Sequence, residues 1–267
     1  CDKEDLGGSN IHVPEFDYNA LSETDKYIYD HYTVPYNVEV VYRWNQGDVS
    51  SDDMRKNLVP PRESQVEPFL EMIEKVWMDT YTAEVGQQTL RSYIPKQLLL
   101  VGSASYNDDG STTEGTAEGG RQIVLYSVND FNFELEQIQS YAHVMHHEFA
   151  HILHQNVEYD AEFEKITPSY SSSWMQMNDE TARSKGFITA YASSSADEDF
   201  AEMVSIMLTN SPEDWDNMIE NAGNAAAVEA LRKKEAIVVA YMKNNWGVNM
   251  KDFQKEVVAA IKAAVRN

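Results

Sequence analysis

The spacing of apolar and polar residues predicts a mixture of strands and helices in the first half of the chain. Ser22 is a suitable N-cap for a short helix that follows it. Residues 38–44 are β-branched and aromatic, which indicates a strand, and residues 61–81 carry apolar side chains at helical spacing. Two further apolar runs, at 97–106 and 121–128, predict two more strands.

The segment between these last two strands, residues 107–120, is rich in glycine, aspartate and threonine. This composition predicts a mobile connecting loop. A calcium-binding loop is a poor fit. If Gly110 occupies the sixth position of an EF-hand loop, Ser105 and Thr116 fall at the first and twelfth positions, where aspartate and glutamate are needed.

The second half of the chain is predicted to be helical. Residues 171–187 show no periodicity and are expected to be irregular. Helices are expected at 133–157, 197–209, after Ser211, at 224–245 and from Met250 to the end. The fold class is therefore α+β. We expect residues 1–19 to form a tether, 20–157 an N-terminal subdomain and 158–267 a helical C-terminal subdomain.

Composition and charge exclude some partners. The 267 residues are 42% hydrophobic, so the chain can bury a sizeable core, and no apolar run is long enough to cross a bilayer. With 44 acidic and 21 basic residues the formal net charge is −23. Such a charge repels nucleic acid and anionic lipid headgroups, so neither is expected as a partner.

Candidate chemistry is concentrated in "HHEFAHILHQ", residues 146–155, which holds four of the seven histidines. His147 and His151 form an HExxH motif, and two imidazoles four residues apart on a helix reach the same ion. Zinc suits imidazole ligands, and Glu148 beside them could act as general base. The alternative is a core helix whose histidines bond to backbone or solvent.

The other histidines nearby, His143, His146 and His154, are expected to be outer partners of the metal ligands or ordinary surface residues. The third ligand distinguishes the classes of zinc enzyme. A metzincin would carry glycine at position 154 and histidine at 157, but this chain has His154 and Val157.

A glutamate from a later helix is the other possibility. Glu198 is followed four residues later by Glu202, so both lie on one helical face. The alternative for this pair is a solvated acidic surface. The roles of the neighbouring Asp197 and Asp199 stay open.

The segment "DEDFAE", residues 197–202, resembles the corresponding element of the gluzincin peptidases. That resemblance implies that Glu198 completes the zinc site and that Glu202 orients a ligand histidine, His147. Tyr191 stands seven residues before Glu198, as in lethal-factor-like zinc peptidases, and the resemblance implies that its phenol assists the oxyanion or leaving group. The alternative is one of fifteen tyrosines that packs as an aromatic ring.

These motifs, together with Cys1, are most similar to the zinc-binding metallopeptidase lipoproteins of Bacteroidetes. The resemblance implies a zincin-like fold and a zinc-dependent peptidase that hydrolyses peptide bonds of proteins or peptides. Cys1 and the acidic stretch after it resemble a processed surface lipoprotein, so we expect an extracytoplasmic, outer-membrane location at the cell surface, with a lipid anchor on Cys1. The alternative function is a non-catalytic surface lipoprotein that binds peptide or glycan.

Overall fold

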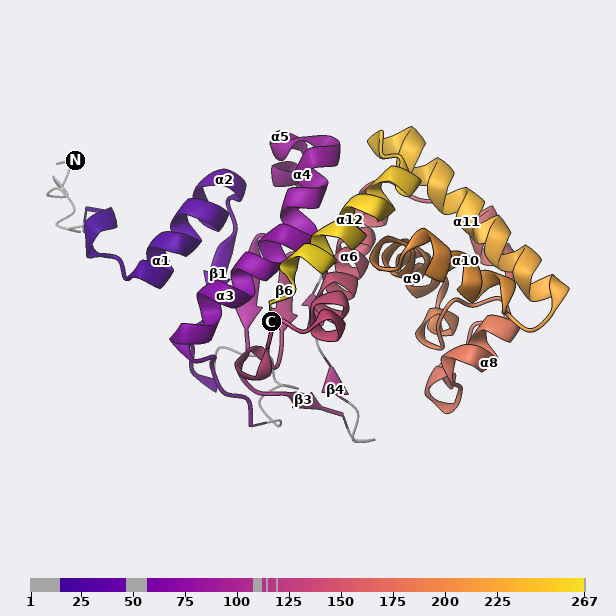
Figure 1. The fold of residues 1–267 in the computed structure, drawn as a ribbon, viewed down its shortest axis with the longest axis horizontal. Helices are drawn as coiled ribbons and strands as arrows, with labels where there is room; N and C mark the ends of the chain where they lie inside the picture. Colours follow the sequence, from indigo (N-terminus) through magenta and orange to yellow (C-terminus); the bar gives the residue numbers. More distant parts are fainter. Residues whose placement is uncertain (1–14, 47–56, 108–111, 114, 119, 267) are drawn as a thin grey trace, which may run out of the picture.

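The computed structural model describes residues 15–46, 57–107, 112–113, 115–118 and 120–266 (Figure 1). Most of the predicted tether, including Cys1, lies outside these residues. Every helix in the described part of the chain is too short or too polar to cross a membrane. The elements form an α+β fold, as predicted.

A four-stranded sheet lies in the N-terminal half of the chain. Three of its strands, β1 (Glu39–Val41), β2 (Gln97–Leu100) and β6 (Gln122–Leu125), are parallel. The fourth, β5 (Gly115–Glu118), pairs antiparallel with β6 and forms one edge of the sheet. The strands β3 (Ser105–Tyr106) and β4 (Thr112–Thr113) form a separate antiparallel pair.

Two of these strands correct the prediction for residues 107–120. That segment contains β4 and β5. Threonine and glycine carry no alternating apolar pattern, so the local sequence did not indicate strands. The pairing comes from the neighbouring strands: β4 pairs with β3, and β5 pairs with β6.

Both faces of the sheet are covered. Side chains alternate along each strand, so neighbouring residues point into different apolar clusters. Leu98, Leu100 and Ile123 face the main core, whereas Leu99 and Val124 join a smaller apolar cluster on the other face. Continuous apolar runs are typical of strands that are covered on both sides.

Helices of the N-terminal half pack over the main-core face of the sheet. The predicted cap at Ser22 is confirmed, because its hydroxyl accepts a hydrogen bond of 3.1 Å from the Asp25 backbone N–H. The helical elements are η1 (Tyr18–Ala20), α1 (Glu23–Ile28), η2 (Tyr29–Thr33), α2 (Val34–Tyr36), α3 (Glu63–Ile73), η5 (Glu74–Met78), α4 (Asp79–Val85), α5 (Gln87–Tyr93) and η6 (Val128–Asp130).

The C-terminal half of the described chain is helical, as predicted. Residues 171–187, however, contain two elements where irregular structure was expected. They are η7 (Trp174–Gln176) and α8 (Asp179–Ser184), and α8 starts at a cap in which Asn178 accepts from the Thr181 N–H. A helix of one or two turns depends on its cap and not on apolar periodicity. The remaining elements are α6 (Leu135–Asn156), α7 (Glu162–Ile166), η8 (Tyr191–Ser194), α9 (Ala196–Thr209), α10 (Pro212–Glu220), α11 (Ala225–Trp246) and α12 (Met250–Ala264).

The last helix, α12, runs back across the N-terminal half, as Figure 1 shows. Its Phe253 ring lies edge-on to Tyr81 of α4, with 4.8 Å between ring centroids, and 5.9 Å from His146 of α6. One main hydrophobic core therefore extends through both halves and holds α6 at its centre. The boundary at residue 157 stays a prediction.

Candidate metal centre

Two packed helices, α6 and α9, carry the predicted site residues. His147 and His151 lie one turn apart on α6, with ring centroids 4.8 Å from each other. On α9 the Ser195 hydroxyl caps the helix by accepting from the Glu198 backbone N–H. This cap puts Glu198 in the first turn, where the helix dipole favours a carboxylate, and its side chain faces α6.

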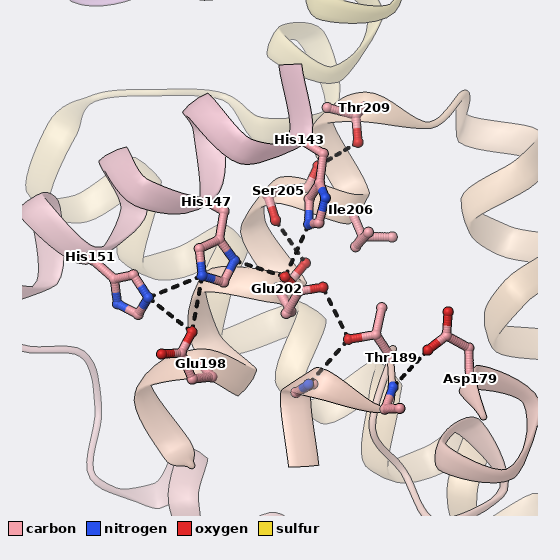
Figure 2. A network of polar contacts seen from close by, with 12 residues as sticks. His143, His147, His151, Asp179, Thr189, Glu198, Glu202, Ser205, Ile206 and Thr209 are labelled. Atoms are coloured by element: carbon pink, nitrogen blue, oxygen red, sulfur yellow. Dashed lines mark hydrogen bonds and ion pairs between the residues drawn. The ribbon is translucent and has the colours of Figure 1, made fainter. Parts of the chain in front are cut away.

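The side chains of His147, His151 and Glu198 converge (Figure 2). Glu198 Oε2 lies 2.9 Å from His147 Nε2 and 3.0 Å from His151 Nε2. The two Nε2 atoms are 3.1 Å apart. Three potential ligand atoms therefore meet at one point, although Glu198 lies 51 residues after His147 and 47 residues after His151.

The other nitrogen of each imidazole has a partner of its own. His147 Nδ1 lies 2.8 Å from Glu202 Oε1, and His151 Nδ1 lies 2.9 Å from His154 Nε2. With a proton on each Nδ1, both Nε2 lone pairs point toward the Glu198 oxygen. Facing lone pairs repel one another unless a cation or a proton lies between them, and this is the arrangement that a metal site needs.

The donor set fits zinc. Two imidazole nitrogens and one carboxylate oxygen are the three protein ligands of a catalytic zinc with an open fourth position. Bonds of about 2.0–2.2 Å put tetrahedral ligands roughly 3.4 Å apart. The three atoms here, 2.9–3.1 Å apart, need only a small outward movement to hold the ion.

Glu202 is buried behind His147. Its carboxylate contacts His143 Nε2 at 3.0 Å as well as His147, and it accepts a hydrogen bond of 3.0 Å from the Thr189 hydroxyl. Thr189 in turn accepts from the Ala192 backbone N–H in η8. Burial disfavours the charged form of Glu202, but the contacts with the two histidines outweigh burial and hold its pKa well below the usual range.

The pKa values of His147 and Glu198 also reflect burial that is opposed by contacts with charged groups. Burial lowers the pKa of His147, but its contacts with Glu198 and Glu202 outweigh burial and raise it to about 10. Burial also opposes ionisation of Glu198, yet hydrogen bonds with His147 and His151 keep its pKa well below the usual range. The carboxylates therefore make this a site for positive charge, either a proton or a metal ion.

Glu148 and Tyr191 lie at the same cleft. Glu148 is partly buried on α6, and burial raises the pKa of its carboxyl. The Tyr191 ring lies 5.8 Å from the His147 ring and is 37% exposed. Burial, and then the charge of Glu198, raise the pKa of Tyr191, so its phenol stays protonated.

The cleft itself has a volume of about 1330 Å³. Its lining includes residues of β3, β4 and β5, among them Tyr106 and Gly115, and residues of η7 and η8. A Cβ at Gly115 would lie 2.4 Å from the Val144 Cγ1 atom of α6, so a larger residue here would force the Val144 side chain to move. The edge of the sheet therefore packs directly against the helix that carries the histidines.

The remaining histidines of α6 have distinct environments. His143 contacts Glu202, and His154 contacts His151, so both touch residues of the converging group. His146 is fully buried and its Nε2–H donates to the Val76 carbonyl at 3.0 Å. The surface location considered for His146 is therefore wrong, because α12 and η5 cover this face of α6.

We expect His154 to influence metal affinity through His151. His154→Phe keeps the ring packed against Phe200 and Tyr159 but removes the nitrogen that fixes the His151 ring. Loss of such an outer partner typically weakens metal binding about 10–100-fold. Competition with a chromophoric chelator measures the zinc Kd. His154→Gln restores a polar atom at the same reach and should recover most of the affinity; equal affinities for His154→Phe and wild type would contradict the contact's role.

The neighbours of Glu198, which the sequence left open, have structural partners. Asp197 Oδ1 accepts from the Tyr159 hydroxyl at 2.7 Å. Asp199 is buried, and its Oδ2 lies 2.5 Å from Nζ of the fully buried Lys234 of α11. Lys234 also donates to the Gly186 carbonyl at 2.7 Å. This pair joins α11, α9 and the segment before η8 behind the metal centre.

Removing the buried cation is expected to be costly. Lys234→Ala leaves Asp199 buried without its counterion, which should lower the free energy of unfolding by about 3–5 kcal/mol. Urea denaturation followed by circular dichroism measures this change. Lys233→Ala is the matched control, because Lys233 is exposed and forms an ion pair with the equally exposed Glu229, so its loss should change stability by less than about 1 kcal/mol. Similar losses for both variants would contradict the assignment.

Comparisons with known proteins agree with this site. The sequence profile of a family described as "Putative zinc-binding metallo-peptidase" matches residues 18–251. A crystal structure of a "putative zinc-binding metallo-peptidase" from Bacteroides caccae superposes with a TM-score of 0.77 and 32% sequence identity, covering 90% of this chain and 92% of that chain. The search among curated proteins gave no match.

The fold and the convergent His–His–Glu group together define a zinc-binding protein with a metallopeptidase fold. More particularly, the chain belongs to the family of putative zinc-binding metallo-peptidases whose profile covers most of its length. The predicted zinc cofactor is thereby confirmed.

Proposed function

We propose that this protein is a zinc-dependent peptidase of the gluzincin type that hydrolyses peptide bonds of peptides or proteins. The observation that carries the proposal is the convergence of His147, His151 and Glu198 within a cleft that Glu148 and Tyr191 also line. Membership of the metallopeptidase family supports the same activity.

Each residue has a role that its surroundings suit. His147, His151 and Glu198 hold the zinc ion, which when bound polarises a peptide carbonyl and lowers the pKa of water. Glu148 takes no part in the convergent group, so its carboxylate is free to accept a proton from the attacking water and return it to the leaving amine. The raised pKa of Glu148 suits a group that must both accept and donate.

Two further residues assist: one stabilises developing negative charge, and the other orients a zinc ligand. Tyr191, protonated and beside His147, donates a hydrogen bond to the negative charge that develops on the peptide oxygen. Glu202 fixes the tautomer of His147 by holding its Nδ1–H. A substrate peptide would lie along β5, which pairs only with β6 among the described residues and whose outer edge can accept an added strand.

Removal of the metal ion tests this function. The purified chain should cleave a mixed set of unstructured peptides, lose the activity on dialysis against a zinc chelator, and regain it with one equivalent of zinc. Mass spectrometry of the products identifies the broken bonds. Zinc-loaded protein that binds the peptides without cutting them would favour the alternative, a non-catalytic binding protein. The lipid anchor on Cys1 stays a prediction, which the mass of the mature protein tests. The outer-membrane location stays a prediction as well.

A further inference from the structure

The cleft holds an unusual share of the exposed apolar side chains. Eight large apolar side chains are exposed among the described residues, and three of them, Tyr106, Met175 and Tyr191, line this one cleft. Tyr106 and Met175 are 65% and 64% exposed and belong to two different elements that line the cleft, β3 and η7. Apolar side chains gathered in a groove mark a surface that binds an apolar ligand.

The element η7 lies close to the metal centre. The Trp174 ring lies edge-on to Tyr191, with 4.9 Å between centroids, and Tyr191 is in turn 5.8 Å from His147. A backbone hydrogen bond of 2.8 Å from Ser171 N–H to Ser193 O ties the segment before η7 to η8. Trp174 is therefore one ring away from His147, and we call the side chains of Trp174, Met175 and Met177, which all line the cleft, the apolar shelf.

The charges around the apolar shelf disfavour a negatively charged substrate group. No lysine or arginine is among the described residues that line the cleft, whereas Glu148 and Asp197 are. A substrate carboxylate, whether a side chain or the C-terminal group, finds no protein cation to pair with here apart from the histidines that face Glu198 and Glu202. An uncharged apolar side chain needs no such partner and is favoured by desolvation.

From these observations, and resting on the proposed peptidase function, we propose that the apolar shelf is a specificity subsite for a large aliphatic or aromatic side chain next to the scissile bond. The cleft thus acts on internal bonds of apolar segments and does not remove C-terminal residues. Methionine is flexible and polarisable, so two methionines beside a tryptophan accommodate leucine, methionine and phenylalanine without a fixed shape.

A cleavage profile tests the shelf. The zinc-loaded chain is incubated with dodecapeptides that share an alanine-rich frame and differ at one central residue: leucine, phenylalanine, methionine, glutamine, lysine or aspartate. Each peptide is supplied with a free and with an amidated C-terminus, and mass spectrometry gives the bond cut and kcat/KM. We expect the three apolar peptides to be cut about 10–200-fold more efficiently than the glutamine peptide. Amidation should have no effect.

Met175→Glu examines the shelf itself. Met175 is mostly exposed, so the variant should fold and bind zinc normally, while kcat/KM for the leucine peptide falls about 10-fold or more and that for the glutamine peptide changes little. The matched control is Leu135→Glu, the same kind of change at a 49% exposed apolar side chain outside the cleft, which should leave both peptides unaffected.

The outcomes separate the two proposals. If zinc is bound and none of the peptides is cut, the proposed peptidase function fails. If peptides are cut with equal efficiency whatever the central residue, or if Met175→Glu slows all of them equally, the peptidase function stands and the apolar subsite is wrong. Faster cleavage of the free-acid peptides than of the amides would overturn the preference for internal bonds.

Discussion

Replacement of Glu148 by glutamine is expected to lower kcat for peptide hydrolysis by about 10²–10⁴-fold, the usual contribution of a general base. Glutamine keeps the size and the hydrogen-bonding reach of the side chain but cannot accept the proton. Glu148 lies outside the group of converging ligand atoms, so zinc content per chain should not change. The measurement is kcat and KM on one peptide, together with zinc by elemental mass spectrometry.

The control for this variant is Glu136→Gln, the same substitution on an exposed residue in the first turn of α6. It should leave both zinc and activity unchanged. A Glu148→Gln enzyme that is fully active and fully loaded with zinc would remove the reason for assigning general-base catalysis. A protein that only binds peptides has no need of a carboxylate here. If the wild type binds peptides without hydrolysing them, and both variants bind with the same affinity, the binding alternative is favoured.

Replacement of Glu198 by alanine is expected to have the largest effect on the metal. Its Oε2 is one of three atoms that converge, and it also holds both Nε2 atoms in place. Loss of an outer partner costs about 10–100-fold in metal affinity, so loss of a direct ligand should cost more than that. Chelator competition gives the Kd, and circular dichroism shows whether α9 is intact.

The neighbouring Asp197 provides the comparison for Glu198. Its carboxylate bonds to Tyr159, so Asp197→Asn should retain zinc at wild-type affinity. A Glu198→Ala protein that holds zinc as tightly as wild type would mean that the third ligand is another residue. The site roles given above to His147, His151 and Glu202 would then need to be assigned again.

Much of the centre could be foreseen from α6 alone. Any helix brings residues four positions apart to one face, so the pairing of His147 with His151 follows from local geometry. The role of Glu148 was predicted from the same HExxH motif, in which it follows the first histidine directly. The continuous apolar runs of β2 and β6 and the cap at Ser22 are equally local features, and they predicted those elements correctly.

Other features depend on parts of the chain outside the segment itself. The strand β5 has a polar, glycine-containing sequence and exists as a strand because β6, which begins after three intervening residues, pairs with it. His146 is buried because α12, which returns from the far end of the chain, covers it. The residues of β5 and those next to His146 carry no pattern that indicates either partner.

The helical histidine pair, the likeness of residues 197–202 to a zinc-ligand element, and the α+β composition could all be read from the amino-acid sequence, because each depends on spacing within a single segment. The way α9 packs on α6 could not, because it depends on contacts between segments. That packing brings Glu198 within 3.0 Å of both histidines and sets Glu202 between His143 and His147, beside a cleft that the apolar shelf also lines. Such contacts depend on the burial of one core shared by both halves of the chain, and no local pattern encodes them.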